Sequence, residues 1–269
     1  MFWWLTAHPD VCGSSVKETH FFDDEIYPRF NATANVHEHG LDVYEKYFAQ
    51  CEGAKVVLEA TPIYLYQQTA IKAFADFLPK PKVLFVLREP SQRAHSQFRF
   101  NKYRLGNIDL GMSYEQYLKK TEGSANNPLD RGFYINFLQP WINAIGKENM
   151  LVVQAESLFS NRVEGMKAIA RFLSLDPSFY DGFDYMKRNE TRKMRSTGLH
   201  RLGLKIQPLV PQWIQEKVLI PLYLKMNSTA MPPVSAKEKE AIQSFKSQFI
   251  ESNQRLAAEF PNIDLSLWK

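Results

Sequence analysis

The sequence predicts an α/β fold, in which a parallel β-sheet carries helices on both of its faces. Short apolar segments alternate with longer segments whose apolar residues recur at helical spacing, which is typical of such sheets. The chain of 269 residues is long enough for one large domain with a substantial core. Because no repeat or linker interrupts it, we expect a single domain over residues 1–269.

The first third of the chain is expected to alternate between helices and strands. Leu41, Tyr44 and Phe48 recur at helical spacing, and Pro79 and Pro81 end a later helix before the next apolar strand. The expected elements, in order, are a helix over 1–8 that is already under way at Met1, a strand over 16–21, a helix over 40–50, a strand over 56–59, a helix over 66–77 and a strand over 82–87.

The remainder of the chain is expected to be mainly helical. Pro90 suits the first position of a helix, and Met166, Ile169 and Phe172 fall on one side of another. The expected elements are helices over 90–103, 113–120, 131–145 and 161–173, a strand over 150–154, loops over 106–111 and 177–196, and helices near 197–206, 211–226 and 235–259.

Composition excludes several classes of function. The net charge of +4 suits an anionic cofactor or an acidic acceptor, but it is too small and too dispersed to indicate nucleic-acid binding. The six histidines show no metal-ligand spacing, so we expect no metal site. No apolar run approaches the ~20 residues of a membrane span, and no basic leader precedes an apolar core.

The cysteines and the glycosylation sequons bear on the compartment. Cys12 and Cys51 lie far apart in the sequence, and we interpret them as small buried hydrophobic residues rather than a disulfide. Three Asn-X-Ser/Thr sequons begin at Asn31, Asn189 and Asn227, but they matter only in a secretory compartment. Because the sequence shows neither a membrane span nor a basic leader, we expect a cytoplasmic protein.

The junction between the strand over 82–87 and the next helix predicts an anion site. Arg88 follows the strand, Pro90 opens the helix, and Ser96 lies two turns along it. A guanidinium, a helix N-terminus with free N–H groups and a hydroxyl together suit a phosphate. The alternative is that Arg88 only forms an ion pair, with Glu89 or Glu59.

The stretch from Lys82 to Ser96 resembles the 3'-phosphate-binding segment of sulfotransferases that use 3'-phosphoadenosine 5'-phosphosulfate (PAPS), above all the heparan-sulfate-type and bacterial branch. The resemblance implies a P-loop-like parallel sheet, with Arg88 and Ser96 holding the 3'-phosphate and Arg93 bracing the helix. Further segments also resemble the family: residues 5–11, 17–23, 59–64 and 132–134, Trp141, and residues 256–268.

The same resemblance implies the reaction. A sulfuryl group would pass from PAPS to a hydroxyl, or less favourably an amine, of a carbohydrate, lipid or small molecule, leaving adenosine 3',5'-bisphosphate; this chemistry requires no metal. Glu18 matches the catalytic base, and His20 and Asp23 match residues that line the acceptor site. Glu59 ends the strand over 56–59, so we expect it at the cleft on the carboxyl edge of the sheet, where it would bind the acceptor. Many glycosaminoglycan enzymes carry a lysine where this chain has Ala60, which argues against a heparan-like acceptor.

The residues themselves leave the base open. On a strand, Glu18 and His20 would point to one face while Thr19 points to the other. A carboxylate and an imidazole on one face could form a hydrogen-bonded pair that positions an acceptor hydroxyl. The alternatives are a solvated Glu18 with a packing His20, or His20 as the base.

A late basic loop supplies further candidates. Arg192 and Lys193 resemble the Arg-Lys pair with which the family covers the 3'-phosphate, although Met194 stands where a glycine usually follows. The alternative is a solvated basic loop.

One part of the family pattern is expected to be missing. The family's N-terminal strand and its Lys-X-Gly-Thr loop bind the 5'-phosphosulfate, whereas Met1 falls within the helix that should follow that loop. We expect one of two explanations. Either the sequence starts within a longer protein, whose missing part could have included a membrane anchor that places it in the Golgi, or the chain is a degenerate family member that keeps only the 3'-phosphate half of the site. The alternative function is an inactive sulfotransferase-fold module that binds a nucleotide or a partner. A nucleotide kinase is disfavoured, because the sequence contains no Gly-x-x-x-x-Gly-Lys motif.

Overall fold

The structure is a computed structural model of the chain, and it describes residues 1–25, 34–185, 193–194 and 228–268. These residues belong to two compact units. Unit 1 combines residues 1–88, 134–186 and 253–269, and unit 2 combines residues 89–133 and 187–252. The interpretation as a single domain stays a prediction.

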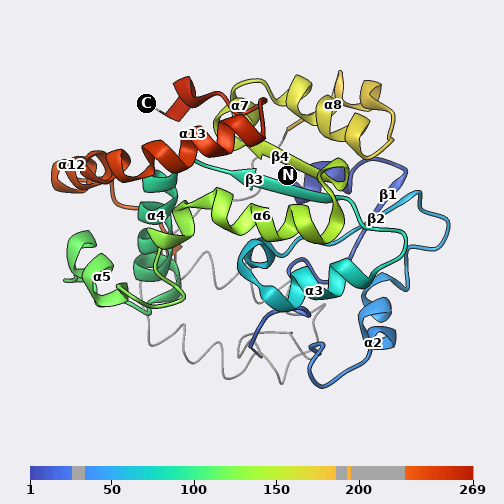
Figure 1. Cartoon of the computed structure of the whole chain (residues 1–269), viewed down its shortest axis with the longest axis horizontal. Helices are drawn as coiled ribbons and strands as arrows, with labels where there is room; N and C mark the ends of the chain where they lie inside the picture. The colour runs from blue at the N-terminus through green and yellow to red at the C-terminus, as the bar shows by residue number, and fades with distance from the viewer. Residues whose placement is uncertain (26–33, 186–192, 195–227, 269) are drawn as a thin grey trace. The chain divides into compact units, whose positions relative to one another are not determined.

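Unit 1 contains two pairs of parallel strands and most of the helices that pack on them (Figure 1). Its elements up to Arg88 are α1 (Phe2–Leu5), β1 (Val11–Gly13), α2 (Leu41–Glu45), η1 (Lys46–Phe48), β2 (Val56–Leu58), η2 (Pro62–Tyr66), α3 (Gln68–Asp76) and β3 (Val83–Leu87). The later elements are α6 (Tyr134–Ile145), η5 (Lys147–Asn149), β4 (Met150–Gln154), α7 (Ala155–Ser160), α8 (Arg162–Phe172), η6 (Pro177–Tyr180), most of α13 (Ile250–Glu259) and η10 (Leu265–Trp268).

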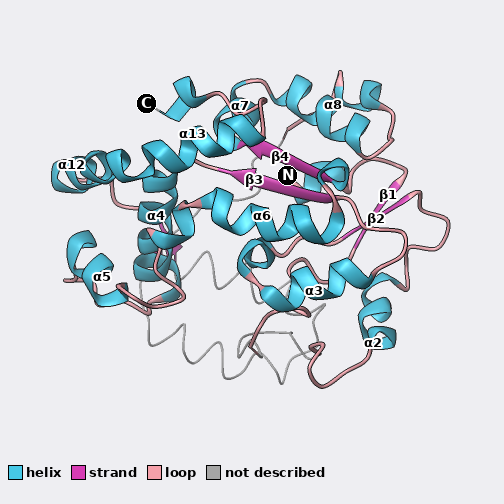
Figure 2. Ribbon diagram, in the orientation of Figure 1, coloured by secondary structure: helices cyan, strands magenta, loops and turns pink. Residues whose placement is uncertain are grey.

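The strands of unit 1 pair in parallel, as expected, but they form two sheets. Strand β1 pairs with β2, with Val11 opposite Val56, and β3 pairs with β4, with Val83 opposite Met150. Within the described ranges the two pairs are not hydrogen-bonded to each other, so the single continuous sheet of the sequence prediction is divided (Figure 2). Val57, in the middle of β2, is 50% exposed.

Helices cover both faces of the β3–β4 pair, which confirms the predicted α/β class. Successive side chains of a strand point to opposite faces. Phe85 of β3 packs on Trp141 of α6 with ring centroids 5.4 Å apart. Its neighbour Leu84 belongs to a different apolar cluster, which contains Met166 and Ile169 of α8. The two clusters together form the core of unit 1.

Unit 2 is mainly helical. Its elements are α4 (Pro90–Arg99), the π-helical turn η3 (Phe100–Leu105), α5 (Tyr114–Thr121), η4 (Asp130–Gly132), β5 (Lys193–Met194), β6 (Ser228–Thr229), α12 (Ala236–Phe245) and η9 (Lys246–Phe249). Its core joins α4, α5 and α12 through Phe98, Tyr114, Tyr117, Leu118 and Ala241. Strands β5 and β6 are antiparallel.

Most of the expected elements in the described part of the chain are confirmed, although several are shorter than expected or divided. Residues 16–21 form no strand, and the strand near them is β1, five residues earlier. The expected loop over 177–196 contains η6 and β5. The expected helices near 197–206 and 211–226 lie outside the described residues.

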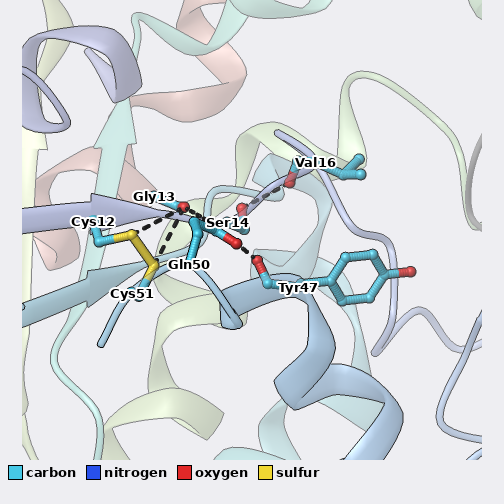
Figure 3. The surroundings of a disulfide bond; sticks show 7 residues. All are labelled: Cys12, Gly13, Ser14, Val16, Tyr47, Gln50 and Cys51. Atoms are coloured by element: carbon cyan, nitrogen blue, oxygen red, sulfur yellow. Dashed lines mark hydrogen bonds between the residues drawn. A yellow bond between two sulfur atoms is a disulfide. The ribbon is translucent and has the colours of Figure 1, made fainter. Parts of the chain in front are cut away.

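The interpretation of the two cysteines was wrong. Cys12 of β1 and Cys51, just before β2, form a disulfide with their Cα atoms 5.4 Å apart (Figure 3). Parallel pairing of β1 with β2 brings the two segments together, a proximity that a separation of 39 residues conceals. A hydrogen bond joins the same two segments: Gln50 Nε2 donates to the Gly13 carbonyl at 2.8 Å.

Among the described residues, no helix is both long enough and apolar enough to cross a membrane.

Candidate functional site

The segment that carries the two proposed catalytic residues is a turn, not a strand. Its backbone has φ of 81° at Glu18 and 53° at His20, in the left-handed region that residues other than glycine seldom adopt. The predicted strand, with Glu18 and His20 on one of two alternating faces, was therefore wrong. The turn nevertheless brings the two side chains together, with Glu18 Oε2 4.0 Å from His20 Nε2.

A row of charged and polar groups lies along this turn. Lys17 Nζ donates to Glu18 Oε1 at 2.6 Å, and His20 Nδ1 lies 2.8 Å from Asp23 Oδ2. This contact orients the His20 ring, and an imidazole that donates it carries a proton on Nδ1. His20 therefore stands between two carboxylates, one nearly buried (Asp23, side chain 6% exposed) and one open to solvent (Glu18, 41%).

Asp23 has an unsatisfied atom. Its Oδ1 is buried and has no hydrogen-bond partner in the part of the chain that the structure describes. A buried oxygen without a donor is unfavourable, and no described residue supplies one here.

A buried hydrogen-bond network lies under the turn. Glu59, which directly follows β2, accepts through Oε1 from the Thr19 N–H at 3.3 Å, from Thr19 Oγ1 at 2.9 Å and from Thr61 Oγ1. The Tyr64 hydroxyl lies 3.1 Å from Thr19 Oγ1 and accepts from the Phe22 N–H at 3.2 Å. Burial raises the pKa of the Glu59 carboxyl, and the hydrogen bonds from Thr61 and Thr19 offset part of that rise.

Glu59 also lines a pocket of about 330 Å³. The aromatic side chains of Tyr44, Phe48 and Phe77 form much of its wall. The sequence placed Glu59 at an acceptor cleft; the structure places it between a pocket and the turn, and its contact with an acceptor stays a prediction.

Arg88 lies where the sequence predicted, directly after β3, and it is exposed. The Tyr134 hydroxyl, at the start of α6, donates to the Arg88 carbonyl at 2.8 Å. Tyr134 is 1% exposed, so this contact fixes the backbone from the core side. Trp141 is fully buried and donates through Nε1 to the Leu65 carbonyl at 3.2 Å, so it serves the packing of the core.

The start of α4 requires a correction. The sequence predicted free N–H groups there for a phosphate, but the Glu89 side chain occupies them. Its Oε1 accepts from the Ser91 N–H at 3.0 Å, and its Oε2 accepts from the Gln92 N–H at 2.8 Å and from Ser91 Oγ at 2.7 Å. Glu89 is thus a buried N-cap, and the first-turn amides are not available to an anion.

The other two polar residues of α4 differ from each other. Ser96 is exposed, as a ligand must be. Arg93 Nη1 donates to Gln97 Oε1 at 2.9 Å and Nη2 donates to the Pro128 carbonyl. These contacts agree with the interpretation of Arg93 as a brace.

The basic loop contributes little to the described site. Arg192 lies outside the described residues. Lys193 is described only through its backbone, which pairs with Thr229 in the β5–β6 ladder.

Thr19 and Thr61 belong to the site but were not predicted from the sequence. Thr19 was assigned to the opposite strand face, away from Glu18 and His20. The spacing Glu59-Ala-Thr61 directly after an apolar strand was a usable signal, since a hydroxyl two residues from a carboxylate can donate to it.

Comparisons with known proteins identify the family of the chain. The family model of the sulfotransferase domain matches residues 14–205. Human bifunctional heparan sulfate N-deacetylase/N-sulfotransferase 2 is 25% identical over 182 residues, covering 64% of this chain and 20% of that protein. Mouse heparan sulfate glucosamine 3-O-sulfotransferase 3B1 is 25% identical over 200 residues, covering 69% of this chain and 47% of that protein. The chain thus matches about a fifth to a half of these relatives' lengths.

The fold agrees as well. The crystal structure of a sulfotransferase from Alicyclobacillus acidocaldarius matches with a TM-score of 0.58 at 23% identity, covering 76% of this chain and 84% of that one. Because the family model matches well over half of the chain, the chain belongs to the sulfotransferase domain family.

Proposed function

We propose that this protein transfers a sulfuryl group to a hydroxyl, or less favourably an amine, of a carbohydrate, lipid or small-molecule acceptor. PAPS would supply the sulfuryl group, with adenosine 3',5'-bisphosphate as the product. The observation that carries the proposal is the row Glu18, His20 and Asp23 in a member of the sulfotransferase family. Sulfuryl transfer to a hydroxyl needs a positioned base, and this row offers one.

The proposed roles follow from exposure and contacts. Glu18 is the base, since its carboxylate is open to solvent and close to the imidazole. His20, oriented by Asp23, hydrogen-bonds the attacking hydroxyl or shares its proton. The unsatisfied Asp23 Oδ1 would accept from a second donor of the acceptor, and Glu59 supports the same side of the site.

The nucleotide side of the proposal uses cationic and hydroxyl groups. An exposed guanidinium is suited to phosphate oxygens because it donates from a planar fork. We assign Arg88 and Ser96 to the 3'-phosphate, with Arg192 and Lys193 as further ligands from the basic loop. With the α4 amides already capped by Glu89, the side chains carry this role.

The disulfide bears on the compartment. Disulfides persist in oxidising surroundings and are rare in the reducing cytosol. The Cys12–Cys51 bond and the three sequons together favour a secretory or otherwise oxidising compartment over the cytoplasm that composition suggested. Thiol titration of protein isolated under acid quench decides between the two.

A transfer assay with labelled PAPS and a panel of hydroxyl and amine acceptors tests the function. Relative to the unmodified protein, Glu18→Gln should lower kcat by about 100-fold or more, and His20→Asn by about tenfold. A larger loss for His20→Asn would make His20 the base. Binding of the nucleotide with no transfer to any acceptor would instead favour the inactive module.

A further inference from the structure

The turn that carries the proposed base cannot be explained by its own residues. Glu18 and His20 both have left-handed φ values although neither is a glycine. Such conformations are unfavourable and persist only where surrounding structure holds them. The residue between them, Thr19, is 1% exposed, so it is the point at which the turn is held.

Glu59 accepts the hydrogen bonds that fix the segment around Thr19. One oxygen, Oε1, accepts from both the backbone N–H and the hydroxyl of Thr19, and also from the Thr61 hydroxyl. Thr61 Oγ1 in turn accepts from the His20 N–H at 3.4 Å. Glu59 therefore reaches the backbone on both sides of the Thr19 side chain.

Two of the described donors to Glu59 Oε1 belong to Thr19, in the middle of the segment that presents Glu18 and His20, and the third is the Thr61 hydroxyl. We propose that Glu59 is a positioning residue, which acts through Thr19 to hold the turn that aims Glu18 and His20 at the acceptor, rather than a group that binds the acceptor or removes its proton. This inference rests on the proposed function and assigns Glu59 a definite part in it.

Conservative and disruptive substitutions at the two partners distinguish positioning from direct catalysis. Glu59→Gln keeps an acceptor oxygen for Thr19, and Thr19→Ser keeps the hydroxyl, so each should retain kcat within about threefold. Glu59→Ala and Thr19→Val remove the contact and should lower kcat by about 30-fold or more, because small displacements of reacting groups are costly. The KM for the nucleotide should stay unchanged in all four variants.

The double variant Thr19→Val/Glu59→Ala adds a second criterion. If both residues act through one contact, its kcat should lie within about threefold of the worse single variant. Losses that multiply would overturn the proposal. So would a Glu59→Gln variant as impaired as Glu59→Ala, or one with a raised KM for the acceptor, since either result requires the charge itself.

A spectroscopic experiment that requires no catalysis tests the position of His20 independently of the proposed function. In nuclear magnetic resonance spectra, the carbon-bound ring protons of His20 should shift in Glu59→Ala and Thr19→Val but keep their positions in Thr19→Ser and in the exposed control Glu52→Gln. If the unmodified protein transfers no sulfate, the proposed function fails. The spectra still test whether Glu59 positions the segment that carries His20. Unchanged His20 signals in Glu59→Ala would refute the positioning role of Glu59.

Discussion

The hydroxyl of Tyr134 donates a 2.8 Å hydrogen bond to the carbonyl oxygen of Arg88. The contact joins the first residue of α6 to the residue that follows β3. Since Tyr134 is buried and Arg88 is exposed, the core fixes the backbone while the guanidinium remains on the surface. The arrangement suits a ligand that must be presented at a defined place.

Tyr134→Phe removes this hydrogen bond and leaves the ring in the core. We expect the free energy of unfolding to fall by about 1 kcal/mol, the usual net value of a buried hydrogen bond. If Arg88 binds the nucleotide, affinity for adenosine 3',5'-bisphosphate should also fall several-fold, because the backbone under Arg88 loosens. Urea unfolding and calorimetry measure the two effects. Unchanged affinity in a destabilised variant would show that the contact serves folding alone.

The Cys12–Cys51 disulfide should contribute substantially to stability. By the chain-entropy argument, a cross-link over 39 residues restricts the unfolded chain enough to stabilise the fold by about 2–4 kcal/mol. Cys12→Ala/Cys51→Ala should therefore unfold at a lower urea concentration than the oxidised protein. A reductant should destabilise the unmodified protein and leave the double variant unchanged. Two free thiols in the native, never-reduced protein would contradict the bond.

The ionisation of Glu59 should make stability depend on pH. Burial raises the pKa of this carboxyl in the folded state, so its contribution is complete below the unfolded-state value of about 4.3 and is lost as pH rises through the folded-state pKa. A glutamine side chain at this position cannot ionise. Glu59→Gln should therefore gain stability relative to the unmodified protein as pH rises from about 4 to 8. Urea unfolding across this range measures the difference, and parallel stability curves would rule out the shift.

The capping role of Glu89 is tested by Glu89→Ala. Loss of the contacts to the Ser91 and Gln92 amides should destabilise the protein by about 1–2 kcal/mol, the usual cost of removing a helix cap. Glu115→Ala, at an exposed first-turn position of α5, serves as the control and should change stability far less. Equal effects of the two substitutions would contradict the cap.

The sequence predicted the class of fold well, because the spacing of apolar residues largely determines which segments form helices and which form strands. Strand β3 and helix α4 have the expected order, since a five-residue apolar run and a helix-starting Pro90 are strong local signals. The pairing of Cys12 with Cys51 was not predictable in this way, because it depends on which strands become neighbours.

The candidate site shows the same division. Glu18 and His20 were identified, but their proximity comes from a left-handed turn that no alternating pattern encodes. The Glu89 cap was missed because an acidic residue before a helix can serve either as a cap or as a neighbour of the anion. Only the placed side chain, with its contacts to the amides of Ser91 and Gln92, decides between them.

The central claim, that a sulfotransferase nucleotide binds at Arg88, is tested most directly by calorimetry with adenosine 3',5'-bisphosphate. The unmodified protein is compared with Arg88→Ala and with Arg171→Ala, an exposed arginine of α8 that serves as the charge control. We predict that Arg88→Ala weakens binding by about tenfold or more, as expected for loss of a charge-assisted contact, while Arg171→Ala binds normally. Equal affinities of Arg88→Ala and the unmodified protein would contradict the account.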